Sequence, residues 1–530
     1  MNKVLVFVLL AIVSTGFTLP SPSFHQEINN KDDIDVIYTP WQLPEIYSQV
    51  YVSYLDERHI VPCKSNNQSH SSFGKIRKRN NPYRASYITP FNSPSTLKDA
   101  IIDYFSWKDP SYKLFGYYQD NSSFEVEVKG FYDMRSLEDT DYSFVGFGFD
   151  STVNIQDKVF MDMDWWKGHF NGDTVSALND PIVDSWYKAG DDGNDVKYID
   201  NLKANLHYVN DFGALSLGRS SFLIGNNISG SIILDNSGDE YGYAGMDYKL
   251  GDFKYSVMQG WLVPDSLDAS YADKRMVDKF IALHKLDWSY KSLNLFLGEE
   301  IVYGNRSFDP NYMIPLGFWR ISEHLQADRD NVLIFGGGSL KYRNLTCYGN
   351  VIIDELTKSK LFSDWWGNKW AVQGGLSQMF DNPLLGDYSR ITAEVTVVRP
   401  WLYTHKYYWN NMSHSQETLG YPLGTNLINY AVELNFPIAK IGSLDLNCNY
   451  TRQGDYANDY TWDYDYYIPQ DEIEDYETKL LAGKINDTIH GSGVFTFELF
   501  NHHFLKTGVS VKSQDSEIET SIAMSYMTRF

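Results

Sequence analysis

Cysteine is scarce in this chain, and its scarcity excludes two classes of fold. The 530 residues contain three cysteines, Cys63, Cys347 and Cys448, which lie far apart in the sequence. A dispersed, odd set gives neither a disulfide framework nor the close spacing of a zinc site. At most one pair could form a bond, and we expect the three side chains to serve as small hydrophobic groups.

Long apolar runs are missing beyond residue 20, where no stretch approaches the roughly 18–20 residues of a transmembrane helix. Basic residues are few: 45 Lys and Arg stand against 68 Asp and Glu, for a formal net charge of −23. This charge excludes nucleic acid as a partner, because a polyanion would be repelled. The chain is therefore either exported and soluble, or it spans a membrane with strands.

Catalytic motifs are the third absence. The sequence has no Gly-x-Ser-x-Gly elbow, no phosphate-binding Gly-rich loop and no His-Glu-x-x-His pair. Two carboxylate pairs, Glu299-Glu300 and Asp354-Glu355, are adjacent in the sequence, and adjacent residues of a strand point to opposite faces. Neither pair can then act as acid and base across one substrate. We expect no enzyme, no catalytic residue, no cofactor and no metal site.

The first residues have the order of an export signal. Lys3 is followed by an apolar run from Val4 to Val13 and then by small residues, which predicts a secretory signal peptide over residues 1–18. The alternative is an N-terminal membrane anchor, for which the run is short. Residues 19–115 carry stretches with helical spacing and a basic patch that fits a solvated loop. We expect a small helical periplasmic segment there.

Aromatic residues are abundant, at 16% of the chain. Soluble sugar-binding folds reach such a fraction, and outer-membrane barrels reach it through aromatic girdles at the two lipid–water interfaces. The pattern from residue 116 onward favours the barrel, because apolar and polar residues alternate there with period two and without helical insertions. The clearest runs are residues 124–129, 391–397, 444–450 and 495–499.

Short turns and longer polar segments separate these runs. Gly251-Asp252 and Asp211-Phe212-Gly213 are turn sequences, whereas 410–417 and 455–478 are long and polar. Short turns at one rim and long loops at the other are typical of a membrane barrel. About 415 residues, at roughly 23 for each strand and its connection, give about 18 strands.

The last residues form a further alternating strand. Alternate side chains of segment 522–530 share one face, and Phe530 closes it. A terminal Phe on such a strand resembles the signal read by the barrel assembly machinery, which we therefore expect as a partner. We predict an all-β fold over residues 116–530: a transmembrane antiparallel β-barrel of about 18 strands. We expect it to be monomeric, in the cell outer membrane and in contact with its lipid.

The middle of the chain carries blocks that resemble a known family. The blocks are Leu217-Gly218-Arg219, Glu323-His324-Leu325, Arg399-Pro400-Trp401-Leu402-Tyr403-Thr404-His405 and Leu419-Gly420-Tyr421-Pro422-Leu423-Gly424. Their order over residues 200–440 resembles the Wzi-type capsule-assembly family of outer-membrane barrels. The chain departs from the family at Leu223-Ile224-Gly225-Asn226-Asn227, where we expect a Trp-Gly-Pro-Gly turn, so no role tied to that turn is carried over.

The resemblance implies an 18-stranded barrel with a helical periplasmic element and a lectin-like role, holding capsular or exopolysaccharide at the cell surface. Aromatic planes stack on sugar rings, and polar side chains hydrogen-bond to hydroxyls. Alternate residues from Arg399 to His405 would share one face of a strand. The alternative places Trp401 and Tyr403 in a lipid-facing girdle, with Arg399 and His405 at the interface. The candidate glycan-binding residues are Arg219, Glu323, His324, Arg399, Trp401, Tyr403 and His405.

Residues 455–478 interleave tyrosine with Asp and Glu. The segment could bind glycan or bridge divalent cations to anionic lipid and polysaccharide, and the alternative is a solvated extracellular loop. Two other functions stay open for the whole chain. One is a porin or transport channel for small solutes, which needs an open lumen. The other is an outer-membrane enzyme, against which the missing nucleophile constellation counts.

Overall fold

The structure is a computed structural model, and it describes residues 114–529 apart from several internal stretches. The predicted signal peptide (1–18), nearly all of the predicted periplasmic segment (19–115) and Phe530 lie outside the described residues, so these predictions stay predictions. The internal stretches left out are 120, 138–139, 173–186, 190–197, 265–276, 315–316, 327–328, 362, 383–385, 416, 439–441, 463, 470, 501–502 and 515–516.

Strand β15 (Gly386–Val398) shows how the alternating sequence builds a barrel wall. Val395 is 42% exposed on the outer face, whereas its neighbours Glu394 and Thr396 are buried on the inner face. The apolar face can then meet lipid while the polar face turns inward. The alternation predicted for residues 391–397 is confirmed.

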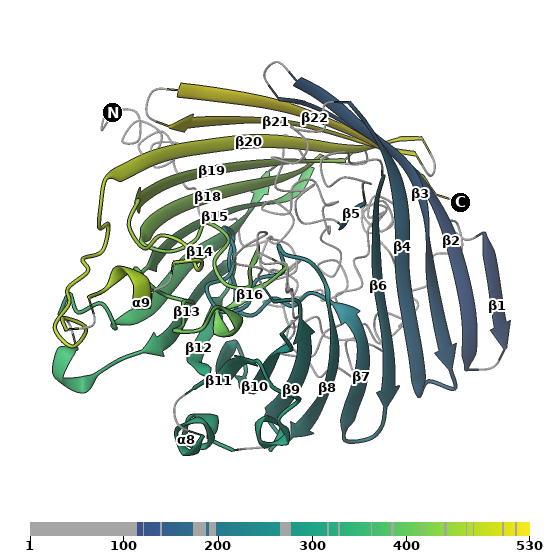
Figure 1. Cartoon of the computed structure of the whole chain (residues 1–530). Coiled ribbons are helices and arrows are strands. Elements are labelled where there is room, and N and C mark those ends of the chain that lie inside the picture. Colours follow the sequence, from purple (N-terminus) through teal and green to yellow (C-terminus); the bar gives the residue numbers. More distant parts are fainter. Residues whose placement is uncertain are drawn as a thin grey trace.

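Eighteen antiparallel strands close into one ring (Figure 1). The ring closes where the last strand pairs with the first, with Tyr526 opposite Tyr132. The predicted barrel and its strand number are thereby confirmed. In ring order the strands are β2 (Ser122–Leu137), β3 (Thr140–Ile155), β4 (Val159–Gly172), β6 (Tyr198–Val209), β7 (Gly213–Ser220), β8 (Tyr241–Leu250), β9 (Phe253–Leu262), β10 (Lys279–Tyr290), β11 (Leu293–Gly304), β12 (Asn331–Tyr342), β13 (Leu345–Glu355), β14 (Lys369–Asn382), β15, β18 (Leu427–Ile438), β19 (Gly442–Gly454), β20 (Ile485–Phe500), β21 (His503–Gln514) and β22 (Glu517–Arg529).

Two short strands add to this ring, β1 (Phe115–Gln119) on β2 and β5 (Tyr187–Ala189) on β6. β1 pairs with the first part of β2, and β22 pairs with the second part, from Lys129 onward. Because β3 occupies the other edge of β2, β1 and β22 follow one another along a single edge. β1 and β22 thus lie end to end along β2, where the barrel closes.

The connections differ in length at the two ends of the barrel. Short turns face the periplasm in outer-membrane barrels, so the end with the long connections faces outward. The turns predicted at Gly251-Asp252 and ahead of Leu215 are confirmed. The described short turns are 156–158, 210–212, 251–252, 291–292 and 343–344, and the long connections include 221–240, 305–330, 399–426 and 455–484.

Helices occur only in connections, among the described residues. We expected the alternating pattern to continue without helical insertions. This expectation is wrong for the long connections, which contain short helices. In the described part of the chain no helix is long and apolar enough to cross a membrane. The elements are η3 (Pro310–Met313), α8 (Trp319–Leu325), η4 (Lys358–Lys360), η5 (Tyr408–Asn410), α9 (Tyr464–Tyr467) and a small hairpin of β16 (Ser413–His414) with β17 (Glu417–Thr418).

Candidate functional site

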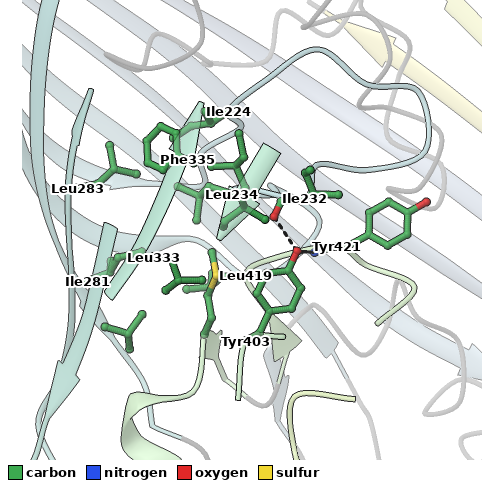
Figure 2. Packing of buried hydrophobic residues seen from close by; sticks show 14 of the residues in the cluster. Ile224, Ile232, Leu234, Ile281, Leu283, Leu333, Phe335, Tyr403, Leu419 and Tyr421 are labelled. Carbon is green, nitrogen blue, oxygen red and sulfur yellow. Dashed lines mark hydrogen bonds between the residues drawn. The ribbon is translucent and has the colours of Figure 1, made fainter. Parts of the chain in front are cut away.

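Two long connections fold back into the barrel and touch one another there. We call residues 221–240 and 402–426 together the plug. The Asp235 amide donates to the carbonyl of Leu419 at 2.7 Å. The Tyr403 hydroxyl donates to the carbonyl of Ile232 at 2.6 Å and accepts from the amide of Tyr421 at 3.2 Å (Figure 2). Burial raises the pKa of the Tyr403 phenol well above its usual value, so the phenol keeps its proton for this bond.

The apolar side chains of the plug form one core with the inner wall of the barrel. Ile224, Ile232 and Leu234 from the first connection lie beside Leu419 from the second. They face inward-pointing wall residues of β10 and β12 (Figure 2). We expected the inner face to line a water-filled lumen. Along these strands it is covered instead by the apolar side chains of the plug. The wall residues shown are Ile281, Leu283, Leu333 and Phe335.

Polar groups fix the plug to the next strands of this wall, β13 and β15. The carboxylate of Glu394 on β15 accepts from the amides of Ile228 and Ser229, at 3.0 and 3.2 Å. The Tyr348 hydroxyl of β13 donates to the same carboxylate at 2.7 Å. Charge-assisted hydrogen bonds of this kind are strong and directional. Glu394 therefore acts as the anchor of the first plug connection.

Glycine permits close packing within and between the two connections of the plug. A Cβ placed on Gly420 would lie 2.4 Å from the ring of Tyr403, and one on Gly230 would lie 2.4 Å from Pro422. Gly230 also has a φ of +100°, which side chains disfavour. The Gly-x-Pro-Leu-Gly block that carried the family resemblance is therefore a packing element of the plug.

Arg399 and Trp401 lie in a second cluster, outside the plug. The guanidinium of Arg399 donates to the carbonyls of Asn368 and Thr478, at 3.3 and 3.0 Å, and burial lowers its pKa. Trp401 is fully buried, and its indole N–H donates to Thr478 Oγ1 at 3.1 Å. These two residues join three outer connections into one cap. The other members of the cluster are Trp365, Trp366, Ala457 and Ile468.

Aromatic rings remain accessible on the surface of this cap. Tyr466 on α9 is 81% exposed, and its ring centroid lies 5.0 Å from that of Tyr467. Tyr467 in turn lies 4.3 Å from Trp462. Another pair, Tyr407 and Trp409, belongs to the second plug connection and stacks at 4.9 Å with an interplanar angle of 3°. The segment 455–478 thus contributes buried residues to the cap and also an exposed surface with tyrosine and acidic residues.

Charged side chains face the barrel interior on the strands that the plug does not cover. Lys129 on β2 forms ion pairs with Asp150 of β3, at 2.9 Å, and with Asp164 of β4. This part of the interior has the polar character predicted for the inner face.

The seven predicted glycan-binding residues do not form one site. Arg219 lies on the outer face of β7 with Leu217, and Glu323 and His324 lie on α8 at the outer wall. His405 lies in the second plug connection beside Tyr407, at 6.2 Å between ring centroids. Arg399, Trp401 and Tyr403 are buried within the cap and plug. Their role toward glycan stays a prediction.

The expected strand from Arg399 to His405 is wrong, and so is its alternative. β15 ends at Val398, and Trp401 and Tyr403 have φ values of 67° and 70°, which no strand allows. Their side chains are fully buried in protein, so they do not form a lipid-facing girdle. Hydrogen bonds from each ring to a neighbouring connection hold this turn, in place of a strand partner.

Sequence reasoning missed the anchor of the plug. Glu394 lies on the polar face of a predicted strand. The alternation predicts that its side chain points inward, but it does not predict which residues it contacts. Ser229 follows the stretch Leu223-Ile224-Gly225-Asn226-Asn227, where the chain departs from the family. That stretch is held by Asn350 of β13, whose side-chain amide donates to the carbonyl of Asn226 at 2.7 Å. No local pattern marks such a long-range contact.

Comparison with known proteins gives a likeness of fold. No family model matches the chain, and no curated protein matches it. Among solved structures it is similar to Wzi of Escherichia coli, with a TM-score of 0.51 and 11% identity, over 95% of this chain and 98% of that one. That protein is described as an outer membrane protein involved in group 1 capsule assembly and as a carbohydrate-binding β-barrel.

Two further solved structures have lower TM-scores. OccK8 (OprE) of Pseudomonas aeruginosa has a TM-score of 0.44 and 10% identity, over 77% of this chain and 98% of that one. OccAB4 of Acinetobacter baumannii has a TM-score of 0.43 and 10% identity, over 80% and 100%. The closed ring of strands and the first likeness make the chain an outer-membrane β-barrel similar in fold to Wzi.

Proposed function

We propose that this barrel holds capsular or exopolysaccharide at the cell surface, without catalysing a reaction. The observation that carries the proposal is the aromatic surface of the cap, formed by the exposed Tyr466 and Tyr467 and the half-buried Trp462, with the acidic residues of 471–477 nearby in the sequence. Aromatic planes stack on sugar rings, and carboxylates accept hydrogen bonds from sugar hydroxyls.

The plug gives the proposal further support. A binding barrel needs a fixed outer surface, whereas a channel needs a wide wet path. Glu394 and Tyr403 fix the two plug connections against the wall and against each other. The outer cap joins the second of these connections through Arg399 and Trp401. The aromatic surface is therefore supported by residues that are themselves buried.

The second candidate is a channel for small solutes, which the ion pairs of the uncovered inner face favour. Lys129, Asp150 and Asp164 line the interior in the manner of a polar lumen. Single-channel recording in planar bilayers separates the two functions. The polysaccharide proposal expects no steady current, and sizeable steady currents would favour the channel.

The polysaccharide proposal is tested in cells of the source bacterium. Deleting the gene is expected to release polysaccharide into the medium, and the unaltered gene is expected to restore cell-bound glycan. A Trp462→Ala, Tyr466→Ala double variant is expected not to restore it, because the stacking surface is gone. The matched control is Tyr342→Ala, an exposed tyrosine at the short-turn end of β12. Cell-bound glycan that is unchanged by the deletion would contradict the proposal.

A further inference from the structure

The connection between β11 and β12 lies on the outside of the barrel. Figure 1 shows α8 outside the ring, beside β10 and β11. Tyr312 of η3 and Trp319 of α8 are fully buried against outward-facing side chains of the wall. We call the described part of residues 305–330 the outer segment. Its wall partners are Tyr255, Val257, Phe280, Ala282, Ile301, Tyr303 and Val332.

A salt-bridge clamp joins the two ends of the outer segment. Arg306 donates from both terminal nitrogens to the carboxylate of Asp330, at 2.5 and 2.7 Å. The Tyr312 hydroxyl donates to the same carboxylate at 2.6 Å. A bidentate pair fixes orientation as well as distance. The segment is therefore a built part of the wall.

Beneath the segment lies a polar pair on the outer face of the barrel. His284 of β10 and Glu299 of β11 are joined by a hydrogen bond of 2.9 Å between Nε2 and Oε2. The amide of Trp319 donates to Glu299 at 2.8 Å, and its indole stacks on the His284 ring at 4.0 Å between centroids. The outer segment thus covers the pair and supplies one of its hydrogen bonds.

This pair lies at the depth of the membrane. Glu299 is the seventh residue of β11, counted from the short turn at 291–292. On β14, the exposed outward residue Val372 is the eleventh, counted from Asn382 at the short-turn end. A transmembrane strand takes about 9–11 residues. An uncovered His284–Glu299 pair would therefore face hydrocarbon, where a polar group is costly.

The outward face of α8 is apolar. Phe318, Ile321 and Leu325 are 55%, 58% and 85% exposed. Residues three and four apart share one face of a helix, so the three side chains form one strip. Leu295 and Leu297, the outward residues of β11 between Glu299 and the short turn, are also exposed. Arg320 and Glu323 of α8 approach within 3.6 Å on another side, and the exposed His324 lies at the edge of the strip.

We propose that the outer segment lies in the outer leaflet of the membrane, with Phe318, Ile321 and Leu325 in contact with lipid acyl chains. The long connections face outward, which places the segment in that leaflet. The segment replaces the strand surface as the lipid contact over β9–β12 and keeps the His284–Glu299 pair out of hydrocarbon. The rival arrangement has the strip above the membrane, in water.

The test measures the lipid contact of single residues in the full-length protein. Cysteine replaces Ile321 or Leu325 in a background where Cys63, Cys347 and Cys448 are alanine, and each variant carries a fluorescent label. The proteins are placed in phosphatidylcholine bilayers that contain a lipid with a nitroxide on its acyl chain. Leu297→Cys is the control for lipid contact, and Tyr466→Cys is the control for water. Heat-modifiable migration in gels shows that each variant has folded.

Quenching at positions 321 and 325 is expected to match that at position 297 within a factor of about two, because all three face the hydrocarbon. Aqueous iodide is expected to quench the label at position 466 far more than the other three. Quenching by nitroxide lipid no stronger than at position 466, with equal access for iodide, would overturn the proposal. If either variant fails to fold, Phe318→Cys takes its place in the same comparison.

Discussion

Ser229 and Glu394 lie 165 residues apart in the sequence, and the amide and hydroxyl of Ser229 both donate to one carboxylate oxygen of Glu394, at 3.2 and 2.5 Å. The hydroxyl also meets that of Tyr421, at 2.9 Å. Ser229 belongs to the first plug connection and Tyr421 to the second. One carboxylate on the wall thereby holds both connections.

Glu394→Gln is expected to loosen the plug. The amide NH2 of glutamine would face donors, so at least one hydrogen bond to Ser229 or Ile228 would be lost. Breaking a buried, charged hydrogen bond costs about 1.5–3 kcal/mol, and we expect a lower guanidinium midpoint of unfolding. We also expect brief channel openings in planar bilayers, because a detached connection leaves the interior. The two measurements check separate consequences of one change.

Ser377→Ala is the control for this experiment. Ser377 also lies on the inner face, where its hydroxyl meets Thr392 Oγ1, a group of the wall, at 3.0 Å. We expect a small loss of stability and no channel openings for this variant. Equal conductance in both variants, or none in either, would show that Glu394 does not hold the plug.

His414 makes the plug sensitive to acid. Burial lowers the pKa of His414 to about 4, and the positive charges of Arg219 and Lys279 act in the same direction. The Val263 amide donates to Nδ1 of the imidazole at 2.9 Å, which requires that nitrogen to be unprotonated. The unfolded chain binds the proton near pH 6.5, whereas the folded chain resists it down to about pH 4.

The folded state is therefore favoured above pH 6.5, and this contribution is lost as the pH falls toward 4. Its size is on the order of 3 kcal/mol, because each pKa unit is worth about 1.4 kcal/mol. His414→Asn keeps an acceptor near the Nδ1 position and cannot titrate. We expect the unfolding midpoint of the unaltered protein to fall more steeply between pH 6.5 and 4 than that of the variant. Parallel curves would contradict the assignment to His414.

Local periodicity was enough to predict the wall of the barrel. In β15 alternate residues point to opposite faces of the wall. The inward position of Thr392 and the outward position of Val395 therefore follow from the local pattern alone. Turn residues such as Gly251-Asp252 are equally local. The strand number follows from counting such units along the chain.

The long connections could not be predicted in the same way. The polar and aromatic residues of 399–405 stand at alternate positions, as on one face of a strand. Trp401 and Tyr403 bond instead to Thr478 and Ile232, from other connections. Their buried rings are fixed by residues about 77 and 171 positions away. The order of polar and apolar residues does not indicate such distant partners. Aromatic residues that pack in the cap and plug were therefore predicted to form a glycan-binding face.

Glu300 is a second inward-facing glutamate, and we expect its replacement to raise the stability of the barrel. It points inward from β11 and is fully buried, and among the described residues neither of its carboxylate oxygens has a hydrogen-bond partner. A buried polar group without a partner costs about 1–3 kcal/mol. Glu300→Met keeps the approximate volume and removes the polar atoms, so we expect a higher free energy of unfolding by a similar amount, read from the guanidinium midpoint.

Glu394→Met is the matched control, since Glu394 is also a buried, inward-facing glutamate. It accepts hydrogen bonds from Ile228, Ser229 and Tyr348, so its replacement leaves buried donors unpaired and is expected to destabilise the protein. The two Glu→Met changes should therefore shift the midpoint in opposite directions. A loss of stability in both would mean that Glu300 has a polar partner in the folded barrel, such as a bound cation or water, and that the plug meets the wall there through a polar contact.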